Sequence, residues 1–244
     1  NAGSDAYNVA IGYEAGNDVT TGVRNVVIGG LAGDKMTSAA DNVVLGYNTG
    51  GAMISAQQNT AVGAYAADAI TSGTANVALG YNALTASVEG DFNTAIGYKA
   101  LEDHNEGNGN GHNTAVGSKA MLNLTTGEFN TSLGSLSMGV GVTTGDYNVA
   151  LGYKALEDAT SGNTNIAVGP LSMTNVLTGA SNIAIGYNTM GAANGSESRN
   201  VAIGHSSLAS LNVDGNNYNV AIGFEAGRAV TTGVQNSIVG SVAG

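Results

Sequence analysis

The stretch Asn93-Thr-Ala-Ile-Gly97 decides the fold, because the chain repeats its pattern almost from end to end. The pattern is Asn, a β-branched residue, a small residue, an aliphatic residue and Gly. Successive copies are separated by 17 residues nine times and by 18, 18, 19 and 20 residues in the other four cases. The fourteen copies begin at Asn8, Asn25, Asn42, Asn59, Asn76, Asn93, Asn113, Asn130, Asn148, Asn165, Asn182, Asn200, Asn219 and Asn236. A period of this length is typical of a solenoid, in which no repeat can bury its apolar side chains alone. We therefore predict an all-β, parallel β-roll or β-solenoid of about 14 coils.

The five repeated residues predict a short strand with two dry faces. We number the Asn as position 0 and the following residues as positions 1, 2 and onward. Positions 1 and 3 share one face of a strand and are mostly aliphatic, so we expect that face to be buried in the coil, as at Ile96, Leu151 and Ile222. Position 2 is Ala in ten copies, where a strand with one wet face would carry a polar residue. We expect this second face to pack against another copy of the chain, which predicts a homo-oligomer.

Two positions are invariant: position 0 is always Asn and position 4 is always Gly. Stacked Asn amides can form a hydrogen-bonded ladder. Gly suits a corner that needs a positive φ or a backbone approach too close for a Cβ atom. A binding site would not need fourteen copies, so we assign these residues a structural role. Examples are Asn8, Asn93, Asn148, Asn219, Gly12, Gly97, Gly152 and Gly223.

The rest of each repeat is expected to form a second short strand and two turns. A Thr-Ser-Gly or Thr-Thr-Gly turn closes the coil, and its Gly, for example Gly73, is expected to supply a positive φ. Position 8 is Leu or Met in the eight central copies and Gly near both ends of the array. We therefore expect a thicker core in the middle of the array than at its ends.

Composition excludes several classes of function. The net charge is −11 with only seven Lys and Arg residues, which disfavours binding to nucleic acid or to anionic lipid. No apolar run is long enough to insert into a membrane. The chain lacks cysteine, so it has neither disulfides nor thiolate metal sites. We expect one repeat array over residues 1–244, cut from a longer fibrous protein, with irregular coils at 101–112 and 210–218.

The repeats resemble those of known fibrous proteins. Asn8-Val-Ala-Ile-Gly12 and Asn219-Val-Ala-Ile-Gly223 resemble the head repeats of YadA-type trimeric autotransporter adhesins. The longer Asn93-Thr-Ala-Ile-Gly-Tyr-Lys-Ala-Leu101 resembles repeats of bacteriophage tail fibres. The resemblance covers essentially the whole chain. It implies a left-handed β-roll that forms a parallel homotrimer, intertwined or side by side, as an extracellular stalk or adhesive head. The coils are longer than those of adhesin heads, so a bacterial surface adhesin and a virion tail fibre both remain open.

Exposed aromatic residues are expected directly after the Gly corner, because position 5 is aromatic in seven copies. Two interpretations remain open. The rings can stack as a ladder along the axis, or they can offer their faces to the sugars of a receptor. The candidate receptor-binding residues are Tyr81, Tyr98, Tyr153, Tyr187 and His205, which replaces Tyr at this position.

The longest insertion gathers the main candidates for a metal site: Asp103, His104, Glu106 and His112. Carboxylates and imidazole can bind a divalent cation. Their spacing matches no calcium or zinc motif, so we predict a solvated loop, no metal and no cofactor.

Together these features predict a non-enzymatic extracellular fibre segment that presents a surface to a glycan or protein receptor. Two alternatives stay open. A glycan-depolymerising tail spike would need paired carboxylates at a cleft, and no such pair is evident. A single-chain ice-binding or surface-binding solenoid would need a flat rank of Thr, but Thr occupies position 1 in only four copies. Because we expect position 1 to be buried, we disfavour this alternative.

Overall fold

The computed structural model describes residues 6–104, 111–193 and 195–244 of an all-β protein. These residues form fourteen strands of three residues each and no helix. The strands are β1 (Val9–Ile11), β2 (Val26–Ile28), β3 (Val43–Leu45), β4 (Thr60–Val62), β5 (Val77–Leu79), β6 (Thr94–Ile96), β7 (Thr114–Val116), β8 (Thr131–Leu133), β9 (Val149–Leu151), β10 (Ile166–Val168), β11 (Ile183–Ile185), β12 (Val201–Ile203), β13 (Val220–Ile222) and β14 (Ser237–Val239). A helix able to cross a membrane is not found in this part of the chain.

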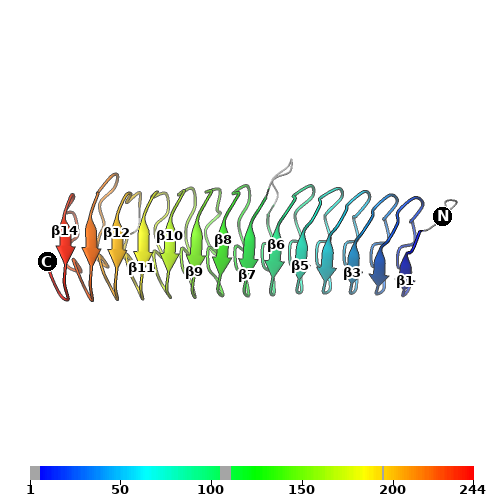
Figure 1. Ribbon diagram of the computed structural model, residues 1–244, viewed down its shortest axis with the longest axis horizontal. Coiled ribbons are helices and arrows are strands. Elements are labelled where there is room, and N and C mark those ends of the chain that lie inside the picture. The colour runs from blue at the N-terminus through cyan, green and yellow to red at the C-terminus, as the bar shows by residue number, and fades with distance from the viewer. Residues whose placement is uncertain (1–5, 105–110, 194) are drawn as a thin grey trace. The chain divides into compact units, whose positions relative to one another are not determined.

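The chain divides into two compact units, one ending at Thr126 and the other beginning at Gly127. The first unit contains β1 to β7 and the second contains β8 to β14. Within each unit the strands lie side by side in chain order, and every repeat makes one coil (Figure 1). Neighbouring strands are parallel and in register, so that Ala78 pairs with Ala95. Equal positions of successive repeats therefore stack on one another, which confirms the predicted parallel β-solenoid.

The invariant Asn residues join consecutive coils through a buried amide ladder. The backbone N–H of Asn76 donates to Oδ1 of Asn59 at 2.9 Å, and its Nδ2 donates to the same oxygen at 3.1 Å. The Nδ2 of Asn76 also donates to the carbonyl of Gly90 at 2.7 Å. Oδ1 of Asn76 in turn accepts from the backbone of Asn93 at 2.9 Å. One buried side chain thus satisfies groups in three coils, which explains why the residue does not vary.

The strand faces are the reverse of those predicted from the sequence. The position-2 residue of β2 to β13 is buried inside the coil, whereas no residue at position 1 or 3 of any strand is buried. In β5, for example, Ala78 is 1% exposed and Leu79 is 43% exposed. The expected burial of Ile96, Leu151 and Ile222 inside the coil is therefore wrong. The coil interior at the strand is narrow, so it accepts Ala, and the larger aliphatic side chains point outward.

Two further positions fill the interior in a complementary way. Position 8 and position 11 both face inward, and a small residue at one is matched by a large residue at the other. Gly33 lies beside Met36, where a Cβ on Gly33 would come within 2.8 Å of the Met36 sulfur. In a central coil Leu84 is fully buried and position 11 is only Ser87. The predicted thinner core near the N-terminal end holds in comparison with the coil of Met121 and Leu124, which are both fully buried. It does not hold in comparison with the coil of Leu84, because Met36 and Met53 are fully buried and supply the missing volume.

The remainder of the coil consists of turns rather than a second strand. Among the described residues it contributes only isolated bridges, such as Ala40 with Gln57. The residue before the Asn and those at positions 6 and 8 take a left-handed conformation, as at Phe92 (φ 58°), Lys99 (φ 55°) and Leu101 (φ 54°). This recurring left-handed geometry prevents a continuous second strand.

The Gly at position 4 and the Gly of the closing turn are required for different structural reasons. Gly97 has a φ of 135°, and a Cβ there would lie 2.5 Å from the carbonyl oxygen of Gly117, so both predicted reasons for Gly hold. Gly73 does not have the positive φ that we expected. A Cβ on Gly73 would lie 2.5 Å from the carbonyl oxygen of Gly90, so close approach of the next coil explains this Gly.

Replacing one Asn of the ladder should destabilise the chain strongly. Asn76→Ala leaves the backbone N–H of Asn93 and the carbonyl of Gly90 buried without their partners. We expect a loss of about 3 kcal/mol in the free energy of unfolding, measured by urea denaturation followed by circular dichroism. Asn17→Ala is the control, because Asn17 is exposed and its amide donates only to the adjacent Asp18. Equal effects of the two changes would contradict the role of the ladder.

Candidate functional site

The most extensive unexplained surface is the outward face of the strands, defined as positions 1 and 3 of each strand. This outward face includes Leu79 in the first unit and Leu133 in the second unit. Leu133 is 52% exposed. No outward position of the fourteen strands in the described residues carries a charge. Natural sheets that face water usually alternate apolar and polar residues and protect themselves with charges. These faces lack both features.

The outward face is large enough to be an interaction surface. Seven strands about 4.8 Å apart, each about 10 Å long, give roughly 330 Å² of apolar face in each unit. This is already comparable to the largest apolar patch of a typical soluble monomer, and such patches usually mark interaction sites. Exposed aromatic residues lie at both ends of the strands and enlarge the apolar surface. The outward face is therefore our candidate interaction surface.

The predicted receptor-binding residues are all exposed, but most of their ring faces are covered. Tyr81 and Tyr98 stack with their centroids 5.7 Å apart and their planes 13° apart. His205 stacks between Tyr187 and Phe224, at 5.1 and 5.2 Å. The interpretation as a stacked ladder is confirmed for these rings. A sugar would meet their edges, their hydroxyl groups and the ring faces that are not stacked.

Tyr153 makes a different contact. Its ring lies 5.6 Å from the ammonium group of Lys154, which also bonds to Glu157 at 2.9 Å. A similar arrangement joins Lys99 to Tyr98 and Glu102. These ion pairs are only partly buried, so we expect them to contribute little to stability. They do place a charged group next to each of the two tyrosines.

The four predicted metal candidates do not form a site in the described residues. His104 is fully buried at position 11, the core position that Met53 and Leu124 occupy in other coils. Its Nε2 lies 3.3 Å from Nδ2 of Asn113. His112 is exposed and stacks on Phe92, with centroids 4.9 Å apart.

The other two metal candidates are Asp103 and Glu106. Asp103 is partly shielded, and this burial, followed by the nearby charge of Glu102, raises the pKa of its carboxyl. Glu106 lies outside the described residues. No group of three or more His, Cys, Asp or Glu side chains suited to a metal occurs in the described parts of the chain. The interpretation of this insertion as a wholly solvated loop is wrong for His104, which belongs to the core.

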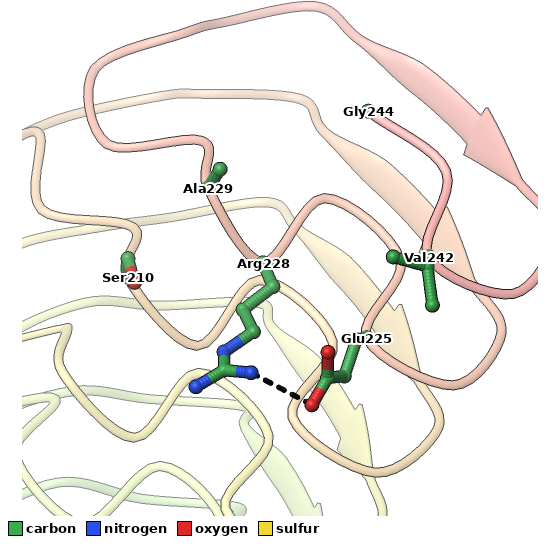
Figure 2. Close-up of a pocket in the computed structure, with 6 residues that line it drawn as sticks. All are labelled: Ser210, Glu225, Arg228, Ala229, Val242 and Gly244. Atoms are coloured by element: carbon green, nitrogen blue, oxygen red, sulfur yellow. Dashed lines mark hydrogen bonds and ion pairs between the residues drawn. The ribbon is translucent and has the colours of Figure 1, made fainter.

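A small cavity lies near the end of the second unit. Figure 2 shows its lining residues, Ser210, Glu225, Arg228, Ala229, Val242 and Gly244. Its volume is about 260 Å³. The guanidinium of Arg228 bonds to Glu225 at 2.7 Å, so the only cation of the lining is already neutralised. This cavity therefore offers neither a free charge nor a pair of carboxylates for chemistry.

Comparisons of this chain with protein-family models, curated proteins and solved structures found no match. Its function has therefore to be inferred from the repeat and from the surfaces described above.

The burial of His104 predicts a pH-dependent stability. Burial lowers its pKa to about 4, partly opposed by a hydrogen bond with the backbone of Thr125. An unfolded chain, with its His pKa near 6.5, takes up the proton first, so the folded state loses stability as the pH falls from about 6.5 to about 4. The full loss is about 3 kcal/mol. Urea unfolding at a series of pH values measures it.

The matched variant is His104→Leu, which places in this coil the residue found at Leu124. This variant should lose the pH dependence contributed by the imidazole while keeping that of the carboxylates. The same slope between pH 6.5 and 4 in both proteins would show that His104 is not buried as described.

Proposed function

We propose that this chain is a non-enzymatic segment of a fibrous protein, a shaft or adhesive head displayed on a bacterial surface or a virion. In this proposal the chain associates with copies of itself through the outward faces of its strands. The observation that carries it is the complete absence of charged side chains at the outward positions of the described strands. A face exposed to water throughout the life of the protein would be expected to carry charges that prevent such association.

The aliphatic columns supply the driving force for assembly. Burying apolar surface contributes about 25 cal/mol per Å², and each coil adds two outward side chains such as Val77 and Leu79. Because these columns repeat in register, a copy of the chain could match them coil by coil. Our sequence interpretation used position 2 for this interface, but Ala78 and its equivalents pack within their own coil. Positions 1 and 3 take over that role in the proposal.

The number of copies comes from the resemblance to trimeric adhesins and tail fibres. A parallel homotrimer would display each surface feature three times. Weak contacts to a multivalent receptor would then be strengthened by avidity. The proposed fibre segment acts by geometry, because it holds a receptor-binding surface at a distance from the cell or virion.

The proposed receptor is a cell-surface glycan or protein. Tyr81, Tyr98, Tyr153, Tyr187 and His205 remain the candidate contacts, since all five are exposed. Stacked rings present their edges, so we expect recognition through Tyr hydroxyl groups. The charge of −11 makes nucleic acid an unfavourable partner, and no direct membrane insertion is proposed.

One observation favours a second candidate, an ice-binding or surface-binding solenoid. Thr60, Thr94 and Thr114 occupy position 1 of β4, β6 and β7, and position 1 points outward. The expectation that these Thr residues are buried is wrong. A regular outward ladder of Thr and aliphatic residues on a monomer could order water or bind a crystal surface.

A glycan-cleaving spike is less well supported. Cleavage needs two carboxylates on either side of a sugar. The cavity near the end of the second unit contains one carboxylate, Glu225, and Arg228 already bonds to it. We therefore propose no enzymatic activity.

Placing a charge on the outward face should prevent assembly without unfolding the coil. Leu79→Asp is expected to give a monomer of 24.1 kDa, whereas the unchanged chain is expected at three times that mass by light scattering. Its circular dichroism should stay that of the wild type, because Leu79 faces outward. Ala78→Asp is the matched control, which should abolish folding because its charge enters the interior.

A wild-type mass other than that of a trimer distinguishes among the candidate functions. A wild-type monomer that shows thermal hysteresis on freezing would support the ice-binding solenoid. A wild-type monomer without that activity would contradict the assembly proposal. Unfolding of Leu79→Asp would show that the outward face belongs to the core of the single chain.

Receptor recognition through tyrosine hydroxyls gives a separate test. Tyr81→Phe together with Tyr98→Phe keeps the ring stack but removes two hydroxyl groups. If these residues bind a glycan, the double variant should lose signal on a glycan array while keeping its mass and thermal stability. Equal signals from variant and wild type would exclude these hydroxyls as contacts.

A further inference from the structure

A fully buried carboxylate stands out in the second unit. Glu197 lies three residues before Asn200, at a place where most other coils have Gly or Ala, for example Gly179 and Ala56. Glu197 has no exposed surface. Its Oε2 accepts a hydrogen bond from the backbone of Gly195 at 3.0 Å, but its buried Oε1 has no hydrogen-bond partner. Packing alone does not require this residue, because Ala56 is also fully buried at the equivalent place.

A second carboxylate from the next coil faces the same space. A Cβ atom on Gly195 would overlap Oδ1 of Asp214 and lie 3.7 Å from Oε1 of Glu197. Gly195 therefore lets Oδ1 of Asp214 take the place of a side chain, and the space between this oxygen and the buried Oε1 of Glu197 has a carboxylate oxygen on two of its sides. Asp214 belongs to the irregular coil at 210–218 and is exposed, which opens the space to solvent.

Hydrogen bonds hold Asp214 in this place. Its Oδ1 accepts from the backbone N–H of Ser196 at 3.1 Å and from the Ser196 hydroxyl at 3.2 Å. The backbone N–H of Gly215 donates to the same hydroxyl at 3.2 Å. Three oxygen-bearing side chains, those of Ser196, Glu197 and Asp214, are thus held around one turn.

No cation of the described chain compensates the two carboxylates. Neither forms an ion pair with a basic side chain in the described residues. Arg199 is two residues from Glu197, but its guanidinium bonds to the hydroxyl of Tyr218 and lies 5.5 Å from that ring. Burying an uncompensated carboxylate costs several kcal/mol, so a positive charge must be supplied from elsewhere.

We propose that Glu197 and Asp214 bind a Ca²⁺ ion in the space beside Gly195. Ca²⁺ takes oxygen ligands in flexible geometry, and it accepts carboxylate, hydroxyl and water oxygens together. Mg²⁺ demands a near-ideal octahedron, and Zn²⁺ prefers the imidazole or thiolate ligands that are missing from this turn. Glu197 supplies its unpartnered Oε1, Asp214 supplies its carboxylate, and water completes the shell on the exposed side. The ion joins two consecutive coils, and this role is independent of self-association.

Calcium titration of the chelator-treated full chain tests this site. Isothermal titration with CaCl₂ should show saturable binding of a single ion per chain, and the midpoint of thermal unfolding should rise with CaCl₂. Glu197→Gln keeps the shape of the side chain and should lose both responses. Asp91→Asn is the matched control: Oδ1 of Asp91 also caps a backbone N–H of the preceding coil, that of Thr74, and this variant should bind Ca²⁺ like the wild type.

Glu197→Ala tests whether a loss of Ca²⁺ binding results from loss of the carboxylate ligand rather than from loss of folding. It introduces the residue found at Ala56, so it should fold, and without Ca²⁺ it should melt above the wild type because it removes an uncompensated buried charge. Three results would overturn the proposal. In the first, the wild type shows no response to millimolar CaCl₂. In the second, Glu197→Gln binds Ca²⁺ as well as the wild type does. In the third, MgCl₂ stabilises the wild type as much as CaCl₂ does.

Discussion

The buried amide of the repeated Asn is the interaction on which the rest of the coil depends. In most coils the Asn side chain bonds to the Asn of the preceding coil and to a carbonyl of the following coil, as Asn76 does with Asn59 and Gly90. This fixes the register of neighbouring coils, and register decides which side chains stack. It also points position 0 inward, and because strand residues alternate, position 2 points inward as well. Positions 1 and 3 are then left on the outside.

This geometry creates the surface to which we assign the function. Once the Asn faces inward, the β-branched and aliphatic residues at positions 1 and 3 lie outside the packing of their own coil, and in our proposal a second copy covers them. The regular register turns two side chains per strand into continuous columns, such as Leu79 beside Ile96. The same requirement for stacking makes the aromatic residues shield one another, as Tyr81 and Tyr98 do. The assembly and display that we propose thus depend on one repeated hydrogen bond.

The fold was largely predictable from the sequence, because period, invariant Asn and invariant Gly each have a local physical meaning. The side of the strand that faces inward was not predictable, because both faces are apolar, with small residues at position 2 and larger ones at positions 1 and 3. The decision depends on how wide the interior is, and that width is set by distant residues such as Met36 and Leu84. Recognising the inward column at position 11 would have shown that His104 replaces a core residue rather than extending a surface loop. The site proposed for calcium was the least visible in the sequence, since Glu197 and Asp214 belong to no metal-binding motif and only the stacking of one coil on the next brings them to Gly195.

Thiol labelling at adjacent positions of β6 tests the central claim most directly, since the natural chain has no cysteine. We would introduce Ala95→Cys and Ile96→Cys separately, each with and without Leu79→Asp, and measure the rate of reaction with a thiol reagent under native conditions. The predicted result is that the thiol of Ala95→Cys stays protected in both backgrounds, whereas the thiol of Ile96→Cys is protected in the assembled chain and reacts quickly in the Leu79→Asp background. A reactive thiol in Ala95→Cys beside a protected one in Ile96→Cys, in both backgrounds, would contradict the inward and outward faces described here. A thiol of Ile96→Cys that reacts quickly in both backgrounds would show that no second copy covers the outward face.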